Sequence, residues 1–404
     1  DTTAHTYFTN NGSILIDSTT YHGMYILGDG GRVIWTNNGT ISTQNNYERG
    51  LYAVATHNGS GSDNGYIYMD NYGSINTNHT RTHGMYLRAE RNPLVYTDHP
   101  GSILTINDAY ENDGLRCSAD LGAQLTYTNN TPITISNVGS EGFYASNDNG
   151  GMVTITYNDT INISNCGGNG LQMYNKNGLA NITNNTTISV FNTANDGVYL
   201  DNIKDDGSLF NTKLNFMNKG TFLIDSVGDD GWYCYASRDT LTFVNDGAID
   251  INYCTDHGWY NNSSNFGAML LSHNNTLTID SVGTNALYNS ATNNAFIRFD
   301  NNAPINISNT LNMGMYNVAA GANLLFNNND SIRIKATAYR GLYNLTNDNN
   351  GFAGQLNFTN DGFIDINNSG DANMYNYALD GLLRFTNNSS INLSYAYENA
   401  GFYN

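Results

Sequence analysis

Short runs of alternating hydrophobic and polar residues recur along the whole chain, and residues 356–367 (LNFTNDGFIDIN) show the pattern most clearly. Apolar and polar residues alternate from Leu356 to Phe358 and again from Ile364 to Ile366, on either side of an Asn-Asp-Gly turn. Alternation with a period of two indicates a strand with one buried face, and Asn-Asp-Gly marks a tight corner. This stretch therefore predicts two short strands around a turn.

The same unit repeats about fourteen times and fills the chain. Most copies carry an asparagine two residues after the first large apolar residue and a second apolar residue six positions after it, and the copies at Tyr68 and Tyr96 slip by one or two residues. The first apolar column consists of Phe8, Trp35, Tyr68, Tyr96, Tyr127, Ile155, Ile182, Phe216, Phe243, Leu271, Phe299, Phe326, Phe358 and Phe385. Such regular repetition is typical of solenoid proteins.

A third marker, the tripeptide Gly-apolar-Tyr, lies between successive copies, as in Gly23-Met24-Tyr25. It recurs every 27 to 34 residues, most often every 27 or 28. Three short strand signals per period predict an all-β protein, a β-solenoid (parallel β-helix) of about 14 coils with roughly 28 residues and three strands per coil. Because each coil of a solenoid contacts only its neighbours, we expect residues 1–404 to form a single domain.

The Gly-apolar-Tyr marker also predicts which side chains face outward. The residue after the glycine is apolar in every copy and must face the interior, so the tyrosine after it faces solvent. The predicted surface ladder consists of Tyr25, Tyr52, Tyr86, Tyr144, Tyr199, Tyr233, Tyr260, Tyr288, Tyr316, Tyr343 and Tyr375. Such a ladder stabilises its own face by cross-strand pairing, or serves as a stacking platform for sugar rings or a contact for a neighbouring filament.

A column of asparagines is expected to stack inside the C-terminal half. It follows the outward tyrosines in register, so its side chains point inward, where amides of successive coils can form hydrogen bonds. The column consists of Asn261, Asn289, Asn317, Asn344, Asn376 and Asn404.

The charge of the chain narrows the function classes. The formal net charge is −19, from 35 acidic and 16 basic residues. Without a basic cluster the chain lacks the electrostatic footprint of nucleic-acid binding, and no apolar stretch is long enough for a membrane span. We therefore expect no nucleic-acid partner and no membrane span. Because the sequence begins at Asp1 without methionine, we interpret it as a processed protein or a piece of one.

Candidate catalytic and metal-binding residues are sparse. Asp229-Asp230, His257 and Arg333-Ile334-Lys335 follow one another in an order that resembles the motif series of polygalacturonase-type β-helix hydrolases. Paired carboxylates could act on a glycosidic bond, but the solenoid register places Arg333 on another face about three coils from His257. Aspartate pairs could hold Ca²⁺ at corners, yet the glycine- and aspartate-rich nonapeptide of calcium-binding β-rolls is absent. We expect no catalytic, metal or cofactor site, and keep a polysaccharide-degrading enzyme as a remote alternative.

The ends of the sequence predict an assembly interface. The chain opens inside a coil and stops at the beginning of another, and 4 residues from Gly401 plus 22 residues to His22 make 26, close to one coil. Neither end carries a recognisable cap, so two copies could complete a shared coil head to tail, whereas the competing interpretation is a piece of a longer repeat protein. The predicted interface consists of Phe8, Asn10, Ile14, Ile16, Tyr25, Phe385, Ile391, Leu393, Gly401, Phe402, Tyr403 and Asn404.

Residues 8–16, 243–251 and 358–366 share the pattern F-x-N-x-G-x-I-x-I or a close variant of it. This unit resembles the repeats of bacterial secreted β-solenoids, such as autotransporter passengers and haemagglutinin-like adhesins. The resemblance implies an extracellular or cell-surface location and a structural or adhesive role. We therefore expect a self-assembling subunit of an extracellular filament or sheath, or, as the alternative, the stalk or passenger of a surface adhesin that binds glycans or a host surface.

Overall fold

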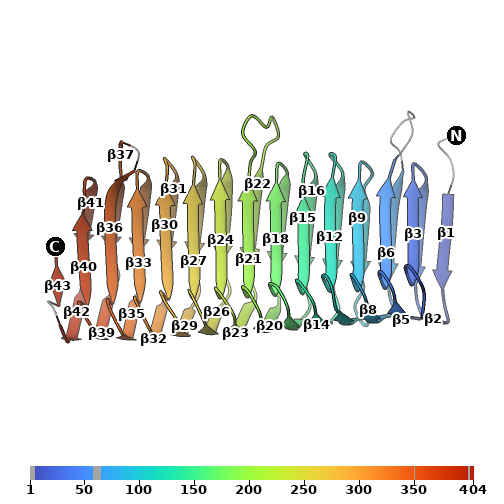
Figure 1. Ribbon diagram of the computed structural model, residues 1–404, viewed down its shortest axis with the longest axis horizontal. Helices are drawn as coiled ribbons and strands as arrows, with labels where there is room; N and C mark the ends of the chain where they lie inside the picture. Colours follow the sequence, from blue (N-terminus) through green and yellow to red (C-terminus); the bar gives the residue numbers. More distant parts are fainter. Residues whose placement is uncertain (1–4, 58–64, 350, 399–400) are drawn as a thin grey trace. The chain divides into compact units, whose positions relative to one another are not determined.

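The computed structural model describes residues 5–57, 65–349, 351–398 and 401–404. The chain is an all-β parallel solenoid of about 14 coils, with about 28 residues and three strands per coil, which confirms the predicted fold. Contacts divide it into two compact units, residues 1–194 with 207–214 (unit 1) and residues 195–206 with 215–404 (unit 2). Within each unit, neighbouring strands of one sheet run in the same direction (Figure 1).

Unit 1 contains three parallel sheets, whose strands alternate along the chain. Its first sheet holds β1 (His5–Asn10), β4 (Arg32–Asn37), β7 (Tyr66–Asn71), β10 (Leu94–Asp98), β13 (Gln124–Asn129), β16 (Met152–Tyr157) and β19 (Leu179–Asn184). Its second sheet holds β2 (Ser13–Asp17), β5 (Thr40–Asn46), β8 (Ser74–Thr80), β11 (Ile103–Ala109), β14 (Ile133–Val138), β17 (Ile161–Cys166) and β20 (Thr187–Thr193). Its third sheet holds β3 (Met24–Asp29), β6 (Leu51–Thr56), β9 (Met85–Glu90), β12 (Leu115–Asp120), β15 (Phe143–Asn147) and β18 (Leu171–Lys176).

Unit 2 repeats this arrangement, and β22 (Lys213–Asn218) contributes residues to both units. The first sheet of unit 2 holds β25 (Thr240–Asn245), β28 (Ala268–His273), β31 (Phe296–Asn301), β34 (Asn323–Asn328), β38 (Gln355–Asn360) and β41 (Leu382–Asn387). The second holds β23 (Thr221–Val227), β26 (Ile249–Cys254), β29 (Leu277–Val282), β32 (Ile305–Thr310), β35 (Ile332–Thr337), β39 (Ile364–Ser369) and β42 (Ile391–Ala396). The third holds β21 (Val198–Ile203), β24 (Trp232–Ser237), β27 (Trp259–Ser264), β30 (Leu287–Thr292), β33 (Met315–Ala320), β36 (Leu342–Asn349), β40 (Met374–Ala378) and β43 (Phe402–Tyr403), and β37 (Phe352–Ala353) pairs with β36.

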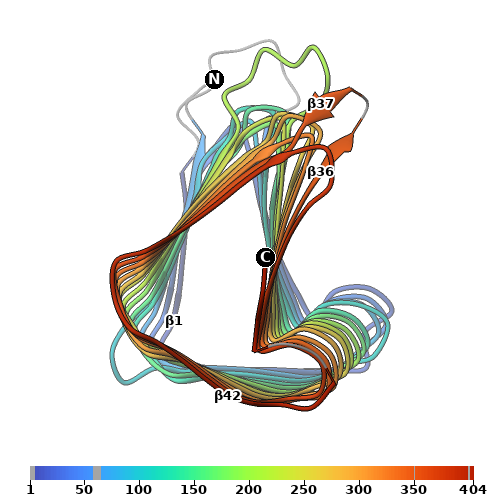
Figure 2. The same cartoon turned by 90° about the vertical axis from the view of Figure 1, so that its left-hand side faces the viewer.

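The three sheets form three walls around one apolar interior in each unit (Figure 2). The alternating residues predicted to face inward are fully buried in the inner coils, as Phe358, Ile364 and Ile366 illustrate. Their columns follow strand pairing in strict register, because one side chain of each coil stacks directly on the next. Burial of these columns supplies the hydrophobic stabilisation that each short strand lacks alone.

One member of the predicted inner column is wrong. The structure pairs Trp35 with Met69, which is fully buried, whereas Tyr68 is 46% exposed. Successive strand residues point to opposite faces, so a shift of one residue exchanges inside and outside. The corner asparagine of this coil is accordingly Asn71, three residues after Tyr68 instead of two.

In most coils a glycine stands two residues before the outward tyrosine, where adjacent coils approach each other closely. A Cβ atom on Gly258 would lie 2.4 Å from Cγ2 of Ile279 and 2.6 Å from the carbonyl oxygen of Ala286. These separations are far below van der Waals contact, so a side chain at this position requires a local shift of its neighbours, as in the two coils that carry Ala286 and Asn373 here. This packing explains why the Gly-apolar-Tyr marker is so regular in the sequence.

A second corner, near the end of each second-sheet strand, turns through a residue in the left-handed region. Asparagine, aspartate and serine dominate there because their short polar side chains tolerate a positive φ. The corner residues are Ser18, Asn45, His79, Asp108, Asn137, Asn165, Asn192, Ser226, Tyr253, Ser281, Asn309, Ala336, Asn368 and Tyr395. The sequence repeat did not reveal this column, and four of its members, His79, Tyr253, Ala336 and Tyr395, depart from these types.

Candidate functional site

The N-terminal edge of unit 1 is open in the described part of the chain. Strands β1, β2 and β3 each pair on one side only, with β4, β5 and β6. Three predicted interface residues, Phe8, Ile14 and Ile16, occupy columns that are fully buried in inner coils but are only half-buried here, and Tyr25 is exposed. The edge thus offers unpaired backbone groups beside apolar side chains, which is the combination that recruits another strand.

The C-terminal edge of unit 2 is open in the same way. Strands β41, β42 and β43 pair with β38, β39 and β40 alone among the described residues. Phe385, Ile391 and Leu393 are half-buried, and Phe402 and Tyr403 are exposed. Gly401 has no side chain, but its carbonyl oxygen accepts a hydrogen bond from Met374 N at 3.0 Å. This bond places the last residues in register with the preceding coil.

The buried corner asparagines of the first sheet form hydrogen bonds in one direction along the coils, so the two edges differ in the group at which this column ends. In unit 1, Asn10 Nδ2 donates to Asn37 Oδ1 at 2.8 Å, and Asn37 Nδ2 donates to Asn71 Oδ1 at 2.8 Å. In unit 2, Asn360 Nδ2 donates to Asn387 Oδ1 at 2.7 Å. In this buried column each of these amides donates toward the higher-numbered coil, whereas outer amides such as Asn38 Nδ2, which donates to Asn11 Oδ1 at 2.8 Å, donate the other way. The column therefore ends at the N-terminal edge in Asn10 Oδ1, which accepts from Gly12 N at 3.1 Å, and at the C-terminal edge in Asn387 Nδ2, which donates to the Ser389 carbonyl at 2.7 Å.

The predicted inward stack is also present in unit 2. Successive side-chain amides bond from Asn261 to Asn376, with N···O distances of 2.8 to 2.9 Å. Trp259 Nε1 donates to the first of them at 2.8 Å. At the other end, Asn376 Nδ2 is buried without a partner, and Asn404, the next residue of the column, is exposed. The stack is confirmed as far as Asn376.

The rings of the outward tyrosines stack on each other, so their faces are not exposed to solvent. In unit 2 the rings of Tyr260, Tyr288, Tyr316 and Tyr343 lie parallel, with centroids 4.6 to 5.0 Å apart. Each ring therefore covers both faces of its neighbours and leaves its edge and hydroxyl group outermost. In unit 1, Tyr25, Tyr52 and Tyr86 stack similarly. This geometry supports the structural interpretation of the ladder, because sugar rings stack on free aromatic faces.

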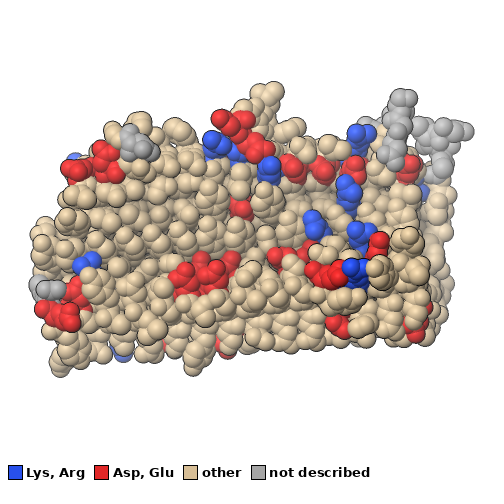
Figure 3. Space-filling model, in the orientation of Figure 1, with Lys and Arg blue, Asp and Glu red and all other residues tan. Residues whose placement is uncertain are grey.

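Acidic residues and one histidine gather at a corner of unit 2. His257 Nδ1 lies 2.9 Å from Asp230 Oδ1 and 3.3 Å from Asp256 Oδ1, and Asp196 and Asp229 adjoin the same group. Figure 3 shows this gathering of acidic side chains near the starts of β24 and β27. Burial, together with the charge of Asp230, raises the pKa of Asp196 to about 8, and burial also raises the pKa of Asp229. Crowded carboxylates thus favour one shared proton or a cation.

The residue types of this cluster suit a small cation, since it contains two groups that share Asp230 and whose ligand atoms lie within 4.8 Å of one another: Asp230 with Asp256 and His257, and Asp230 with Asp196 and Asp229. The hydrogen bond between His257 and Asp230 already satisfies part of the charge. The sequence pointed to Asp229, Asp230 and His257 but missed Asp196 and Asp256, although acidic residues one or two positions before the glycine marker would have revealed them.

The remaining member of the hydrolase-like motif series lies elsewhere. Arg333 lies on β35 in the second sheet, where its guanidinium donates to Ser331 Oγ at 3.0 Å. The structure therefore does not bring it to the Asp230–His257 cluster, and the constellation that suggested a polysaccharide hydrolase is not assembled. The Asp205-Asp206 pair is likewise outside both groups of clustered ligands among the described residues.

Comparisons with known proteins return no relatives. No protein-family model matches the chain, and neither a curated protein nor a solved structure shows significant similarity to it. The described part of the chain contains no helix with the length and apolarity needed to cross a membrane.

Proposed function

We propose that the protein is a structural subunit that polymerises head to tail into an extracellular filament or sheath. The supporting observation is the opposite polarity of the two open edges: Asn10 presents an amide oxygen and Asn387 presents an amide N–H group. A contact between unlike edges continues the hydrogen-bonded asparagine column, whereas two like edges would oppose oxygen to oxygen or N–H to N–H. Such a heterologous contact does not close, so it generates a filament.

The coil register defines the expected joint. If β1, β2 and β3 of one copy continue the sheets that end at β41, β42 and β43 of another, Phe8 stacks on Phe385, Ile14 covers Ile391, and Tyr25 stacks on Tyr403. Each of these pairs repeats a contact that adjacent coils make within a unit, such as Phe358 on Phe385 or Tyr375 on Tyr403. Strand addition of this kind draws its affinity from backbone hydrogen bonds and its register from the side-chain columns.

The alternative function is that of a stalk or passenger of a surface adhesin, and it predicts a different partner for the two edges. In that case further coils or caps of a longer chain would occupy them, and the protein would stay monomeric. The resemblance of the repeat unit to secreted solenoids supports a location outside the cell for both functions.

Negative-stain electron microscopy across a concentration series tests the proposal. We expect unbranched fibres whose length increases with protein concentration, because each subunit adds through one reversible edge contact. Separate monomers at every concentration would contradict it and favour the adhesin stalk.

Two variants that each block one edge test the polarity of the contact. Ile14→Lys places a charge in the N-terminal edge and Ile391→Lys places one in the C-terminal edge, and each residue is half-buried, so the lysine can stay solvated in the monomer. We expect each variant alone to be monomeric and their equimolar mixture to stop at dimers in analytical ultracentrifugation. Leu15→Lys, on the exposed face of β2, is the matched control and should form fibres. Dimers of either single variant alone would indicate contact between like edges and overturn the head-to-tail arrangement.

A further inference from the structure

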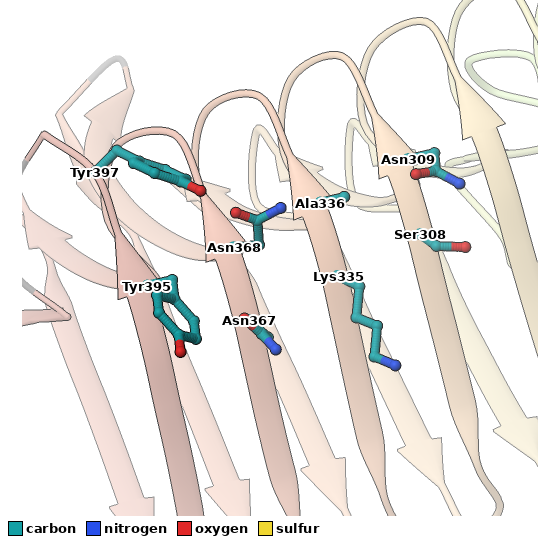
Figure 4. Close-up of a pocket in the computed structure, with 8 residues that line it drawn as sticks. All are labelled: Ser308, Asn309, Lys335, Ala336, Asn367, Asn368, Tyr395 and Tyr397. Carbon is teal, nitrogen blue, oxygen red and sulfur yellow. The ribbon is translucent and has the colours of Figure 1, made fainter.

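A groove of about 580 Å³ crosses the outside of unit 2 at the left-handed corner of the second sheet. Figure 4 shows side chains from four successive strands, β32, β35, β39 and β42, around it. Its size falls within the range of roughly 300–1,000 Å³ that is typical of small-molecule sites. The lining residues are Ser308, Asn309, Lys335, Ala336, Asn367, Asn368, Tyr395 and Tyr397.

Ala336 stands at the left-handed corner inside this groove and cannot form the side-chain hydrogen bonds that asparagines form at the same corner. Elsewhere each corner amide donates to the preceding coil, as Asn165 Nδ2 does to Asn137 Oδ1 at 3.0 Å and Asn192 Nδ2 does to Asn165 Oδ1 at 2.8 Å. Alanine has no amide and a short side chain, so it leaves a gap between the corner residues on either side, Asn309 and Asn368. A surface hollow with unused amide groups is the result.

The polar side chains around the gap are available to a ligand. Within the described ranges, the side chains of Asn367 and Asn368 make no hydrogen bond and Lys335 makes no ion pair. Asn309 uses its N–H group on Asp280 at 2.7 Å, which leaves its carbonyl oxygen as an acceptor. The groove therefore offers amide donors and acceptors together with one cation, and no carboxylate lines it.

Two tyrosines supply free aromatic faces at one end of the groove. Tyr395 and Tyr397 are 74% and 72% exposed, and neither ring contacts another aromatic ring in the parts of the chain that the structure describes. Tyr395 occupies the left-handed corner position with a φ of 54°, which is uncommon for a bulky residue and sets its ring outward. These rings differ from the stacked tyrosines of the third sheet, whose faces are covered by their neighbours.

We propose that this groove binds a glycan. A pyranose ring presents an apolar C–H face that stacks on tyrosine and a rim of hydroxyl groups that pairs with the amides of Asn367 and Asn368 and with Lys335. A nucleic acid needs several cations and the groove has one, while an apolar peptide would leave the row of amides unpaired. The inference goes beyond the filament proposal and stands on residues of unit 2 alone.

The test is saturation-transfer difference NMR, which tolerates large assemblies, on the full chain with hexasaccharides of β-1,4-glucose, β-1,4-N-acetylglucosamine and α-1,4-galacturonate. We expect at least one of them to bind saturably. The double variant Tyr395→Ala/Tyr397→Ala should lose at least about fivefold in affinity, because two aromatic stacking contacts of about 0.5–1.5 kcal/mol each are removed. Binding of galacturonate alone would support the same site with Lys335 as its main contact, and Lys335→Gln would then weaken it.

Two further variants separate binding from structure. Ala336→Asn should fill the gap, continue the amide column and abolish binding without loss of folding. Tyr253→Ala is the matched control, because Tyr253 occupies the same corner position, with a φ of 51° and 62% exposure, but lies outside the groove. Its binding should be unchanged. Failure of all three saccharides to bind, or equal binding by the groove variants and the wild type, would overturn the proposal.

Discussion

The two units build the same coil with different side chains in the same columns. In unit 2, the outward column is tyrosine in every coil from Tyr199 to Tyr403, and successive rings lie 4.4 to 5.2 Å apart. In unit 1, Arg116 and Gln172 interrupt it. Arg116 lies over the rings of Tyr86 and Tyr144, at 5.3 and 4.6 Å from their centroids, and beside Asp113 at 3.4 Å. A charged contact thus replaces aromatic stacking.

The inward-facing column of the third sheet also differs between the two units. Unit 2 holds a buried stack of neutral amides from Asn261 to Asn376, whereas the corresponding column of unit 1 is apolar, as at Leu87 and Cys117. The hydrogen-bonded run of corner asparagines that begins at Asn10 ends at Asp98, a buried carboxyl group. Neutral ladders respond little to salt or pH, while buried carboxylates and cation–π contacts respond to both. The comparison therefore predicts that the Asn261–Asn376 stack of unit 2 and the surroundings of Asp98 in unit 1 lose stability under different conditions.

The largest expected effect comes from breaking the neutral stack of unit 2. Asn317→Leu removes both ladder bonds of this residue and leaves Asn289 Nδ2 and Asn344 Oδ1 buried without partners. Two unsatisfied buried groups cost about 4 kcal/mol together. Hydrogen-exchange mass spectrometry should show a loss of protection centred on β30, β33 and β36 that is independent of pH and salt.

Asn306→Leu is the control for that experiment, because Asn306 lies on the outward face of β32 and is only half-buried. It should change local stability by no more than about 0.5 kcal/mol, the usual range for surface substitutions. Equal effects of the two substitutions would mean that the stacked amides contribute nothing beyond their volume.

The sequence predicted the solenoid and its inner columns because a repeat of about 28 residues reveals register without any knowledge of contacts. The prediction was wrong where the residue type typical of a column does not stand at the position that strand pairing assigns to that column. The preference for an aromatic residue selected Tyr68, whereas strand pairing places Met69 in the column. The groove at Ala336 could not be predicted from the sequence. It depends on a left-handed corner and on the space between neighbouring side chains, and the alternation of apolar and polar residues reports neither. The placement of Asp230 between Asp196 and Asp256 likewise could be seen only once three coils were stacked.

The second expected effect is a pH dependence of unit 1 that originates at Asp98. Burial raises the pKa of this carboxyl group to about 6, against hydrogen bonds from Asn71 and Tyr96 that favour the charged form. Since the folded pKa exceeds the ordinary value of 3.8, the folded state binds the proton more tightly. Its contribution, about 3 kcal/mol for a shift of this size, is present below pH 4 and lost as the pH rises through 6.

Asp98→Asn isolates this contribution, because an amide can accept from Asn71 and does not titrate. We expect hydrogen-exchange protection of β7, β10 and β13 to fall between pH 4 and 7 in the wild type and to stay nearly level in the variant. The difference between the two proteins cancels other groups that titrate in this range, such as Asp201, whose pKa burial raises to about 7. Parallel pH profiles would show that Asp98 is not the origin.

The smallest expected effect distinguishes the two forms of the outward ladder. Tyr288 stacks between Tyr260 and Tyr316, whereas Tyr144 has Arg116 on one side and Gln172 on the other. Tyr288→Ala should cost about 2 kcal/mol at any salt concentration, since two aromatic contacts are lost. Tyr144→Ala should cost about 1 kcal/mol at low salt and less at 1 M salt, because the cation–π contact that it removes is partly screened. Hydrogen exchange at both salt concentrations measures the local stability that each variant loses. The same salt response in both variants would remove the distinction between the stacked and the charged ladder.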